Sequence, residues 1–471
     1  MKKLSIADRT AQHPIKAIQF GEGNFLRAFV EWMIELLNEQ SDFNGSVAIV
    51  QPLENGLIHL LKAQDGLYHH VRQGIENGET IDEVKLIQCV STLVNPFEEQ
   101  AEYFALAEIP SVRLIFSNTT EAGIVFDDSD RPEAGQLANT FPGKLTQLLK
   151  HRFDHFEGDK GKGVAMIPCE LIEQNGTKLK KCIAQYIDLW NLGEDFQTWV
   201  NETCAFANTL VDRIVPGYPK DEIETLTERI GIQDQLVVKS ESFHLFVIEA
   251  PEFVQELFPA HRLGLNVKYV KDITPYRTQK VRILNGAHTS MVPIGLLYGL
   301  ETVSETIDDA ETGKLMREII FDEIVATIQI PGEDPKEFAD QVISRFKNPF
   351  IRHELTAISL NSIAKFKVRV LPTILDYLSI KGHLPNKLIF SLACLIHLYL
   401  RDTHSLKDDE TYLNFFESIK SDEPETLVKK VLANSSLWDQ DLSVIEGLSD
   451  LLTTHFKAIA SEQLKEVLLN M

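Results

Sequence analysis

Three side chains that can do proton chemistry lie close together between residues 280 and 288, in the stretch KVRILNGAH. Lys280, Asn285 and His288 lie among the apolar residues Val281, Ile283, Leu284 and Ala287. Burying an amine, an amide or an imidazole without a partner is costly, so these groups either bond to neighbours or face a pocket. On a helix, all three fall within one broad arc, with Lys280 and His288 about 80° apart in projection.

The three residue types together favour the interconversion of an alcohol and a ketone. A lysine amine in a desolvated pocket has a lowered pKa and can exchange a proton with an alcohol. An asparagine amide can donate to the oxygen that gathers charge, and a histidine can orient a hydroxyl group. Such a site needs no metal. Taken singly, Lys280 could instead reach solvent, and Asn285 could be a turn residue. His288 could be a core histidine whose ring nitrogens bond to neighbouring groups.

A second arrangement uses the same lysine. Tyr276 and Lys280 have the Y-x-x-x-K spacing of short-chain dehydrogenases, in which the tyrosine is the acid/base. Tyr276 lies far beyond a single dinucleotide-binding unit that starts near Gly21, and it falls in a helical part of the chain. We therefore expect Tyr276 to have no catalytic role.

A glycine-containing turn follows the first strand-like run, in IQFGEGNFLRAF. Gly21 and Gly23 precede an amphipathic stretch from Leu26 to Glu39. Glycines allow the backbone to approach a pyrophosphate, and the helix N-terminus supplies N–H donors. The third glycine of G-x-G-x-x-G would fall at Leu26, so a plain strand-to-helix turn is the alternative.

The end of the second strand-like run indicates which dinucleotide would bind. It reads VQPLENG, with Gln51 and Glu54 and no basic residue before Lys62. A 2′-phosphate calls for an arginine or lysine there, so the sequence favours NAD over NADP, with Gln51 near the ribose.

Composition excludes several classes of partner. The 471 residues carry a formal net charge of −23, which argues against binding to nucleic acid or to an anionic membrane. An anionic small molecule would need a local basic pocket. The five scattered cysteines form no C-x-x-C pair, and the N-terminus does not resemble a signal peptide. We expect a cytoplasmic protein whose oligomeric state the sequence leaves open.

The order of elements predicts an α/β fold followed by a helical region. Strand-like runs at 15–20, 46–50, 112–118, 163–168 and 235–240 alternate with helical patterns, which predicts a mostly parallel sheet. Helical periodicity dominates the segments 308–328, 334–346, 354–380, 386–401, 426–433 and 442–469. We predict a Rossmann-type domain over residues 1–270 and a mostly α-helical domain over residues 271–471.

The K-x-x-x-x-N-x-x-H pattern of Lys280, Asn285 and His288 resembles the signature of the polyol-specific long-chain dehydrogenases, the mannitol dehydrogenase family. GEGNFLRA, TTEAG (119–123), NTLVDRIVP (208–216) and DITPY (272–276) resemble that family's segments in order and spacing. Within the family, SNTTEAGI, FPGKL and PCELIEQNG are most similar to members that interconvert D-tagaturonate and D-altronate. The alternatives are a fructuronate/mannonate or mannitol-type enzyme and a non-catalytic NAD-binding regulator.

The resemblance implies roles for individual residues. Lys280 would be the general acid/base, Asn285 part of the oxyanion pocket, and His288 a substrate-positioning group. Asn175 is the candidate for a second oxyanion donor, and the alternative is a turn residue before a helix. The implied cofactor-binding residues are Phe20, Gly21, Gly23, Asn24, Phe25, Gln51, Thr119, Thr120 and Glu121.

Two cations could hold the carboxylate of a sugar acid. Arg277 lies one helical turn before Lys280, at a position where the pattern of mannitol-type enzymes, P-Y-E-x-x-K, has a glutamate. The planar guanidinium of an arginine suits bidentate binding of a carboxylate. Lys365 stands where the family also has a lysine. Arg277 could instead pair with Asp272 or Glu241.

Overall fold

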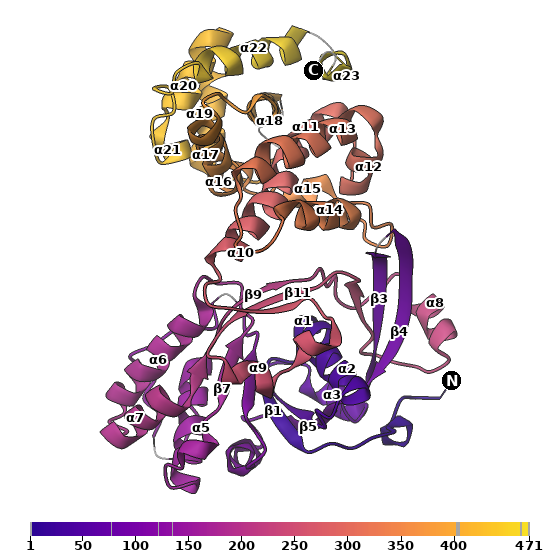
Figure 1. The fold of residues 1–471 in the computed structure, drawn as a ribbon, viewed down its shortest axis with the longest axis vertical. Helices are drawn as coiled ribbons and strands as arrows, with labels where there is room; N and C mark the ends of the chain where they lie inside the picture. Colours follow the sequence, from indigo (N-terminus) through magenta and orange to yellow (C-terminus); the bar gives the residue numbers. More distant parts are fainter. Residues whose placement is uncertain are drawn as a thin grey trace. The chain divides into compact units, whose positions relative to one another are not determined.

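The computed structural model describes residues 2–76, 78–120, 122–133, 135–401, 406–461 and 464–469. The chain divides into two compact units (Figure 1). The first holds Met1–Gly74 and Thr80–Ile273, and the second holds Ile75–Glu79 and Thr274–Met471. The division after Ile273 lies beside the expected boundary at 270/271.

A six-stranded sheet organises the first unit, and each of its neighbouring strand pairs is parallel. Its order is β5-β2-β1-β6-β7-β8. The bounds are β1 Ile15–Phe20, β2 Ser46–Val50, β5 Val90–Val94, β6 Leu114–Ser117, β7 Ala165–Pro168 and β8 Ala205–Phe206. Counted along the chain, these strands have the order 3-2-1-4-5-6 of dinucleotide-binding folds. The predicted Rossmann-type sheet is confirmed.

Both faces of this sheet are covered, because apolar residues occupy successive positions of its strands. Ile18 and Phe20 of β1 point to a core shared with α4, α5, α6 and α7. Ala17 points to the opposite core, which includes Phe29 and Phe246. Figure 1 shows α5, α6 and α7 gathered on one side of the sheet. Near-continuous burial of this kind is typical of a parallel sheet covered on both faces.

Two smaller sheets complete the first unit. One has the order β10-β3-β4, with β3 Tyr68–Glu76, β4 Glu79–Ile87 and β10 Val238–Glu241. The other has the order β12-β11-β9, with β9 Asn208–Asp212, β11 Leu245–Glu249 and β12 Val267–Val270. The expectation that 235–240 continues the large sheet was wrong: β10 pairs with β3 instead.

The helices of the first unit follow the strands in alternation. They are η1 Ile6–Asp8, α1 Asn24–Leu26, η2 Arg27–Glu31, α2 Trp32–Gln40, α3 Ile58–Ala63, α4 Gln100–Ala105, η3 Leu106–Glu108, α5 Phe141–His155, η4 Lys160–Lys162, α6 Asn175–Leu189, α7 Glu194–Thr203, α8 Ile223–Ile230, α9 Phe253–Leu257 and η5 Ala260–Leu263. The first helical run after β1 continues from Asn24 to Gln40, with η2 as a π-helical segment inside it.

The second unit is mostly helical, as predicted. Its helices are α10 Thr274–Gln279, η6 Lys280–Asn285, α11 Gly286–Tyr298, α12 Val303–Asp308, α13 Ala310–Glu318, η7 Ile319–Ile324, η8 Val325–Thr327, α14 Pro335–Phe346, α15 Leu355–Ile358, α16 Ser362–Arg369, α17 Leu371–Lys381, α18 Asn386–Arg401, α19 Glu410–Ile419, α20 Pro424–Ala433, α21 Ser435–Trp438, α22 Leu448–Ser461 and α23 Leu464–Leu469.

Two details of this unit depart from simple periodicity. The predicted segment 354–380 is three helices, because Asn361 takes a left-handed conformation before α16 and Pro372 lies in the first turn of α17. The apolar run 388–400 is the buried α18, which packs on α11 and α22.

None of the described helices is long and apolar enough to cross a bilayer. The five cysteines, all in described segments, are buried free thiols.

Candidate functional site

The glycine turn lies where β1 and β6 end side by side. Phe20, the last residue of β1, is in register with Ser117, the last of β6. Gly21 follows with a φ of +111°, and a Cβ there would lie 2.9 Å from the main-chain oxygen of Asn118. Only glycine fits this position without strain. In open parallel sheets, ligands bind at the carboxyl ends of the strands where the strand order reverses, which here is between β1 and β6.

Gly23 differs from Gly21 in its surroundings. It is the N-cap of α1 with a φ of −67°, and a Cβ there would meet nothing within 4 Å. The open space therefore lies directly before the first backbone N–H groups of the helical run 24–40. A side chain at Gly23 would occupy this space, so a glycine here leaves room for a pyrophosphate in front of those N–H groups.

The other residues of this turn are held by neighbours. Phe20 is fully buried, with its ring 5.0 Å from that of Phe141. Arg27 donates to Asn24 Oδ1 at 2.6 Å, and the half-buried Phe25 ring stacks on Phe29 at 4.9 Å. Phe20 can therefore offer only its backbone to a ligand, while Asn24 and Phe25 remain partly accessible.

Gln51, directly after β2, bonds within its own loop. Its side chain is buried, and its amide donates to the main-chain oxygens of Leu53 and Glu54 at 2.8 and 3.0 Å. Its oxygen accepts from the Ile58 N–H at 3.3 Å. These bonds hold the loop after β2, in which Glu54 and Asn55 are exposed polar residues, and a place for Gln51 near the ribose stays a prediction.

The turn after β6 is strained and tightly bonded. Thr119 donates through its N–H and its hydroxyl to Glu170 Oε1, each at 3.0 Å. Thr120 is exposed and has a φ of +94°, which is rare for a β-branched residue and is typical of functional turns. Glu121 lies outside the described residues. Burial raises the pKa of Glu170, and its bonds to Thr119 and Ser117 oppose this shift.

Asn175, the candidate second oxyanion donor, is a structural residue in this geometry. It is fully buried at the start of α6, and its amide donates to the main-chain oxygens of Pro168 and Glu170 and to Thr209 Oγ1 at 3.0–3.1 Å. Its oxygen accepts from Gly176 and Thr209 N–H groups, both at 2.9 Å. Both amide hydrogens are used, so none is left for a substrate.

In the second unit, Lys280 and Asn285 are the first and last residues of the π-helical segment η6. The Gly286 N–H donates to the oxygen of Val281, five residues back. In an α-helix, residues five apart point about 140° away from each other. In a π turn they lie nearly one above the other. The segment therefore brings Lys280 and Asn285 onto one side, and both are partly exposed.

His288 lies in the first turn of α11, three residues after Asn285. Its side chain is 8% exposed, and its Nε2 has no hydrogen-bond partner among the described residues. The ring lies 4.4 Å from that of Phe346 and 4.9 Å from that of His353. Burial, followed by the effects of His353, Arg345, Arg369 and Lys365, lowers the pKa of His288 well below its usual range. His288 is thus neutral near pH 7, and its buried Nε2 is bonded by none of the described residues.

Sequence inspection missed most of the cations around His288. Of these only Lys365 was expected. It is half-buried on α16, and its ammonium donates to the main-chain oxygen of Ile358 at 2.8 Å. Burial and Arg369 lower the pKa of Lys365. The available signal was the spacing of Lys365 and Arg369, two like charges four residues apart on one helix, an arrangement that is unfavourable unless a ligand offsets it.

Tyr276 and Arg277 lie just before Lys280, and we expected only Arg277 to contact a substrate. Arg277 is half-buried on α10, one turn before Lys280. The Tyr276 hydroxyl donates to Glu333 at 2.8 Å, and burial together with this carboxylate raises the pKa of Tyr276 to about 12. A tyrosine acid/base needs the opposite shift, which supports our expectation that Tyr276 is not catalytic.

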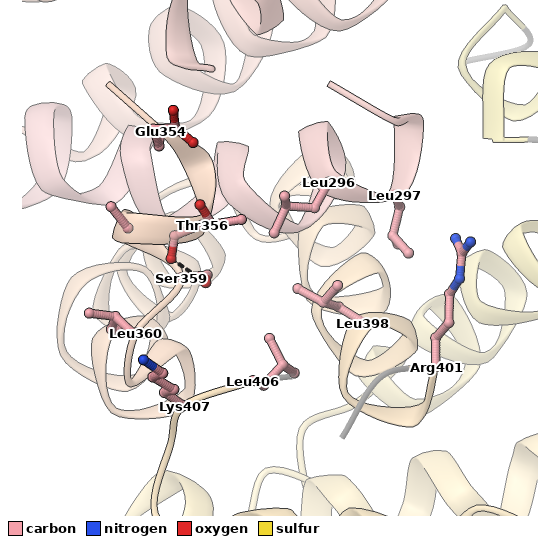
Figure 2. A pocket seen from close by; sticks show the side chains of 11 residues that line it. Leu296, Leu297, Glu354, Thr356, Ser359, Leu360, Leu398, Arg401, Leu406 and Lys407 are labelled. Atoms are coloured by element: carbon pink, nitrogen blue, oxygen red, sulfur yellow. Dashed lines mark hydrogen bonds between the residues drawn. The ribbon is translucent and has the colours of Figure 1, made fainter. Parts of the chain in front are cut away.

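A separate cavity of about 680 Å³ in the second unit does not include these residues (Figure 2). Five leucines line it together with polar and charged side chains, namely Glu354, Thr356, Ser359, Arg401 and Lys407. Because Lys280, Asn285 and His288 are not among the lining residues, this cavity is not the site of the lysine helix.

Comparison with known proteins agrees with the motifs. The family model "Mannitol dehydrogenase Rossmann domain" matches residues 15–260, and "Mannitol dehydrogenase C-terminal domain" matches residues 272–460. The altronate oxidoreductase of Bacillus subtilis (strain 168) is 46% identical over 464 residues, covering 98% of this chain and 96% of that protein. The altronate oxidoreductase of Phocaeicola vulgatus is 44% identical over 97% of this chain and 96% of its own length. The resemblance predicted from the motifs is confirmed.

Solved structures share the fold at lower identity. A substrate-free D-sorbitol dehydrogenase aligns with a TM-score of 0.79 and 21% identity, covering 99% of both chains. A Pseudomonas fluorescens mannitol 2-dehydrogenase, in a ternary complex with NAD and D-mannitol, aligns with a TM-score of 0.66 and 21% identity over 99% of this chain and 96% of that one. The architecture of two units is therefore one that these dehydrogenases also have.

Proposed function

Because this chain belongs to the mannitol dehydrogenase family, we propose that it is an NAD-dependent oxidoreductase that interconverts D-tagaturonate and D-altronate. One observation carries the proposal. The lysine, asparagine and histidine suited to alcohol–ketone chemistry lie on one helical segment, in a chain 46% identical to an altronate oxidoreductase.

The first unit offers a place for the cofactor. The main chain around Gly21 and Gly23 would hold the pyrophosphate, and the turn at Thr119 and Thr120 would lie at the same edge of the sheet. When bound, the nicotinamide supplies a hydride to the substrate's keto carbon or accepts one from its carbinol carbon. NAD is preferred over NADP because the loop after β2 has no basic residue before Lys62.

The residues of the lysine helix would handle the proton and the oxygen. In the reducing direction, the Lys280 ammonium gives its proton to the alkoxide oxygen as the C=O bond becomes a C–O single bond. The Asn285 amide donates to the same oxygen while charge builds on it. His288 is neutral, so its free Nε2 can bond a neighbouring hydroxyl and fix the reacting carbon. This route uses no metal ion.

The nearest rivals differ in substrate. A fructuronate/mannonate enzyme would act on another sugar acid, and a mannitol-type enzyme would act on a neutral polyol. Arg277, half-buried one turn before Lys280, would favour a sugar acid if it faces the substrate. A non-catalytic NAD-binding regulator would keep the glycine turn and need none of the three helical side chains.

One assay separates these possibilities. Purified protein is mixed with NADH and, in parallel, with D-tagaturonate, D-fructuronate or D-fructose, and NADH consumption is followed by absorbance. We expect the highest kcat/KM with D-tagaturonate. Preference for one of the other two sugars would replace the proposed substrate. NADH binding with no turnover of any of them would leave the regulator as the remaining function.

A further inference from the structure

Several basic side chains of the second unit lie close enough to His288 to lower its pKa, and none of the described residues bonds its Nε2. We call this group the basic cluster and define it as His288, Arg345, His353, Lys365 and Arg369. Arg345 is 8% exposed, and Lys365, Arg369 and His353 are half-buried. Half-burying Lys365 and Arg369, two cations four residues apart on one helix, is costly, and it stands out in a chain of net charge −23.

The backbone explains why Arg369 lies close to the proposed reaction site. A Cβ on Gly286 would lie 3.1 Å from the main-chain oxygen of Arg369, so α16 ends against the start of α11. Gly286 directly follows Asn285 and comes two residues before His288. Lys365 is one turn earlier than Arg369 on α16, on the same side of that helix.

Arg369 differs from the other arginines near this site. Its guanidinium makes no hydrogen bond or ion pair with any residue in the described ranges, although it is half-buried. The neighbouring Arg352, by contrast, is exposed and bonds to both Glu301 and Glu354. Burial lowers the pKa of Arg369, yet a guanidinium stays charged, so an anion is the partner that would offset its cost.

We propose that Arg369 binds the carboxylate of a sugar-acid substrate, with Lys365 as a second cation beside it. The planar guanidinium matches a carboxylate in two parallel hydrogen bonds, which a hydroxyl of a neutral polyol cannot reproduce. His288 then bonds a hydroxyl farther along the same substrate. The inference rests on the proposed function, because it assigns the acid end of that substrate.

The test measures binding without turnover. Full-length protein saturated with NADH is titrated by calorimetry with D-altronate, which cannot react with the reduced cofactor, and with D-altritol, in which CH₂OH replaces the carboxylate. The variants are Arg369→Gln, Arg369→Lys, Arg277→Gln and the exposed control Arg352→Gln, each checked by its melting temperature and its NADH affinity.

We expect Arg369→Gln to raise the Kd of D-altronate about 10- to 100-fold, the usual range for losing a charge-assisted hydrogen bond, and to leave the Kd of D-altritol unchanged. Arg369→Lys keeps the charge but loses the fork, so we expect a smaller increase. Arg352→Gln removes the same charge and should change neither Kd. If Arg369→Gln does not fold, Arg369→Lys decides.

Three results would overturn the inference. An unchanged Kd of D-altronate in folded Arg369 variants would do so. An equal rise in the Kd of D-altronate and of D-altritol would also do so. A loss confined to Arg277→Gln would assign the carboxylate to Arg277 instead. Failure of the proposed function looks different. If the wild-type protein binds another sugar acid, such as D-mannonate, and Arg369→Gln weakens that binding, the substrate proposal is wrong and the role of Arg369 stands.

Discussion

Asn175 in the first unit and His288 in the second are both buried polar residues that we expected to bind substrate. Asn175 is 0% exposed and His288 is 8% exposed. Asn175 uses both amide hydrogens and its oxygen on α6, β7 and β9. His288 leaves Nε2 without a described partner beside several cations. Burial is the same in both cases, and only the unused bonding capacity of His288 points to a ligand.

The same distinction applies to the two glycines after β1. Gly21 is enclosed, because a Cβ would press on the main chain at Asn118, whereas Gly23 faces open space. Gly21 is therefore required by the fold. Gly23 is free to serve a cofactor. In both pairs, the residue whose surroundings are incomplete is the better candidate for function.

The largest effect should come from Lys280→Ala. We expect kcat to fall by about 10²–10⁴-fold, because the variant loses the group that delivers the proton, while the Kd of NADH stays nearly constant. Steady-state kinetics and fluorescence titration with NADH measure the two quantities. Tyr276→Phe is the matched control and should lower kcat by no more than a few-fold. The reverse ranking would restore the tyrosine mechanism.

Gly23→Val should weaken NADH binding about 10- to 100-fold without lowering the melting temperature, since its Cβ would occupy the space left for the pyrophosphate. Calorimetric titration with NADH measures the loss. Gly21→Val, in contrast, should lower the melting temperature as well. If folded Gly23→Val binds NADH like the wild type, the open space at Gly23 is not the cofactor site.

His288→Leu should reduce kcat/KM up to about 100-fold, because the substrate loses the group that orients it. It should not destabilise the protein, since an unpartnered buried nitrogen is replaced by an apolar group of similar size. Thermal unfolding and steady-state kinetics together test this pattern. A marked loss of stability with normal activity would place His288 with Asn175 among the structural residues.

Asn175→Ala should show the opposite pattern. The free energy of unfolding should fall by about 1–3 kcal/mol, because the main-chain groups at Pro168, Glu170 and Thr209 lose their buried partner. The kcat of the folded fraction should change least of the four variants. Denaturant unfolding gives the free energy. A large fall in kcat at normal stability would return Asn175 to the reaction site.

Sequence patterns predicted the elements whose signals are local. The strands β1 and β2 have the predicted bounds, and the glycine turn follows directly from the first of them. Pairing is not local, which is why β10 was placed in the wrong sheet: its apolar run suits any buried strand, and only contact with β3 decides. The internal hydrogen bonds of Gln51 and Asn175 could not be predicted for a related reason, because residue type does not show whether bonding groups are already used.

The basic cluster shows the same limit in the second unit. Arg345, His353 and Arg369 belong to separate segments, and no spacing along the chain predicts that all three influence His288. Of its cations, Lys365 was predicted from the family resemblance. Only the structure shows that Arg369 lies near the lysine helix, because the end of α16 closely approaches Gly286.

The π turn at Lys280–Asn285 can also be understood as a one-residue insertion that the helix absorbs. Removing one of the apolar residues inside it, such as Val281, would let the segment return to α-helical winding. Lys280 and Asn285 would then be four residues apart, about 40° in projection, so the two side chains would stay on one side of the helix. At its present length, α-helical winding would instead point Lys280 about 140° away from Asn285, although neither residue had been replaced. The winding of this segment, as well as its composition, thus determines whether the three side chains act together.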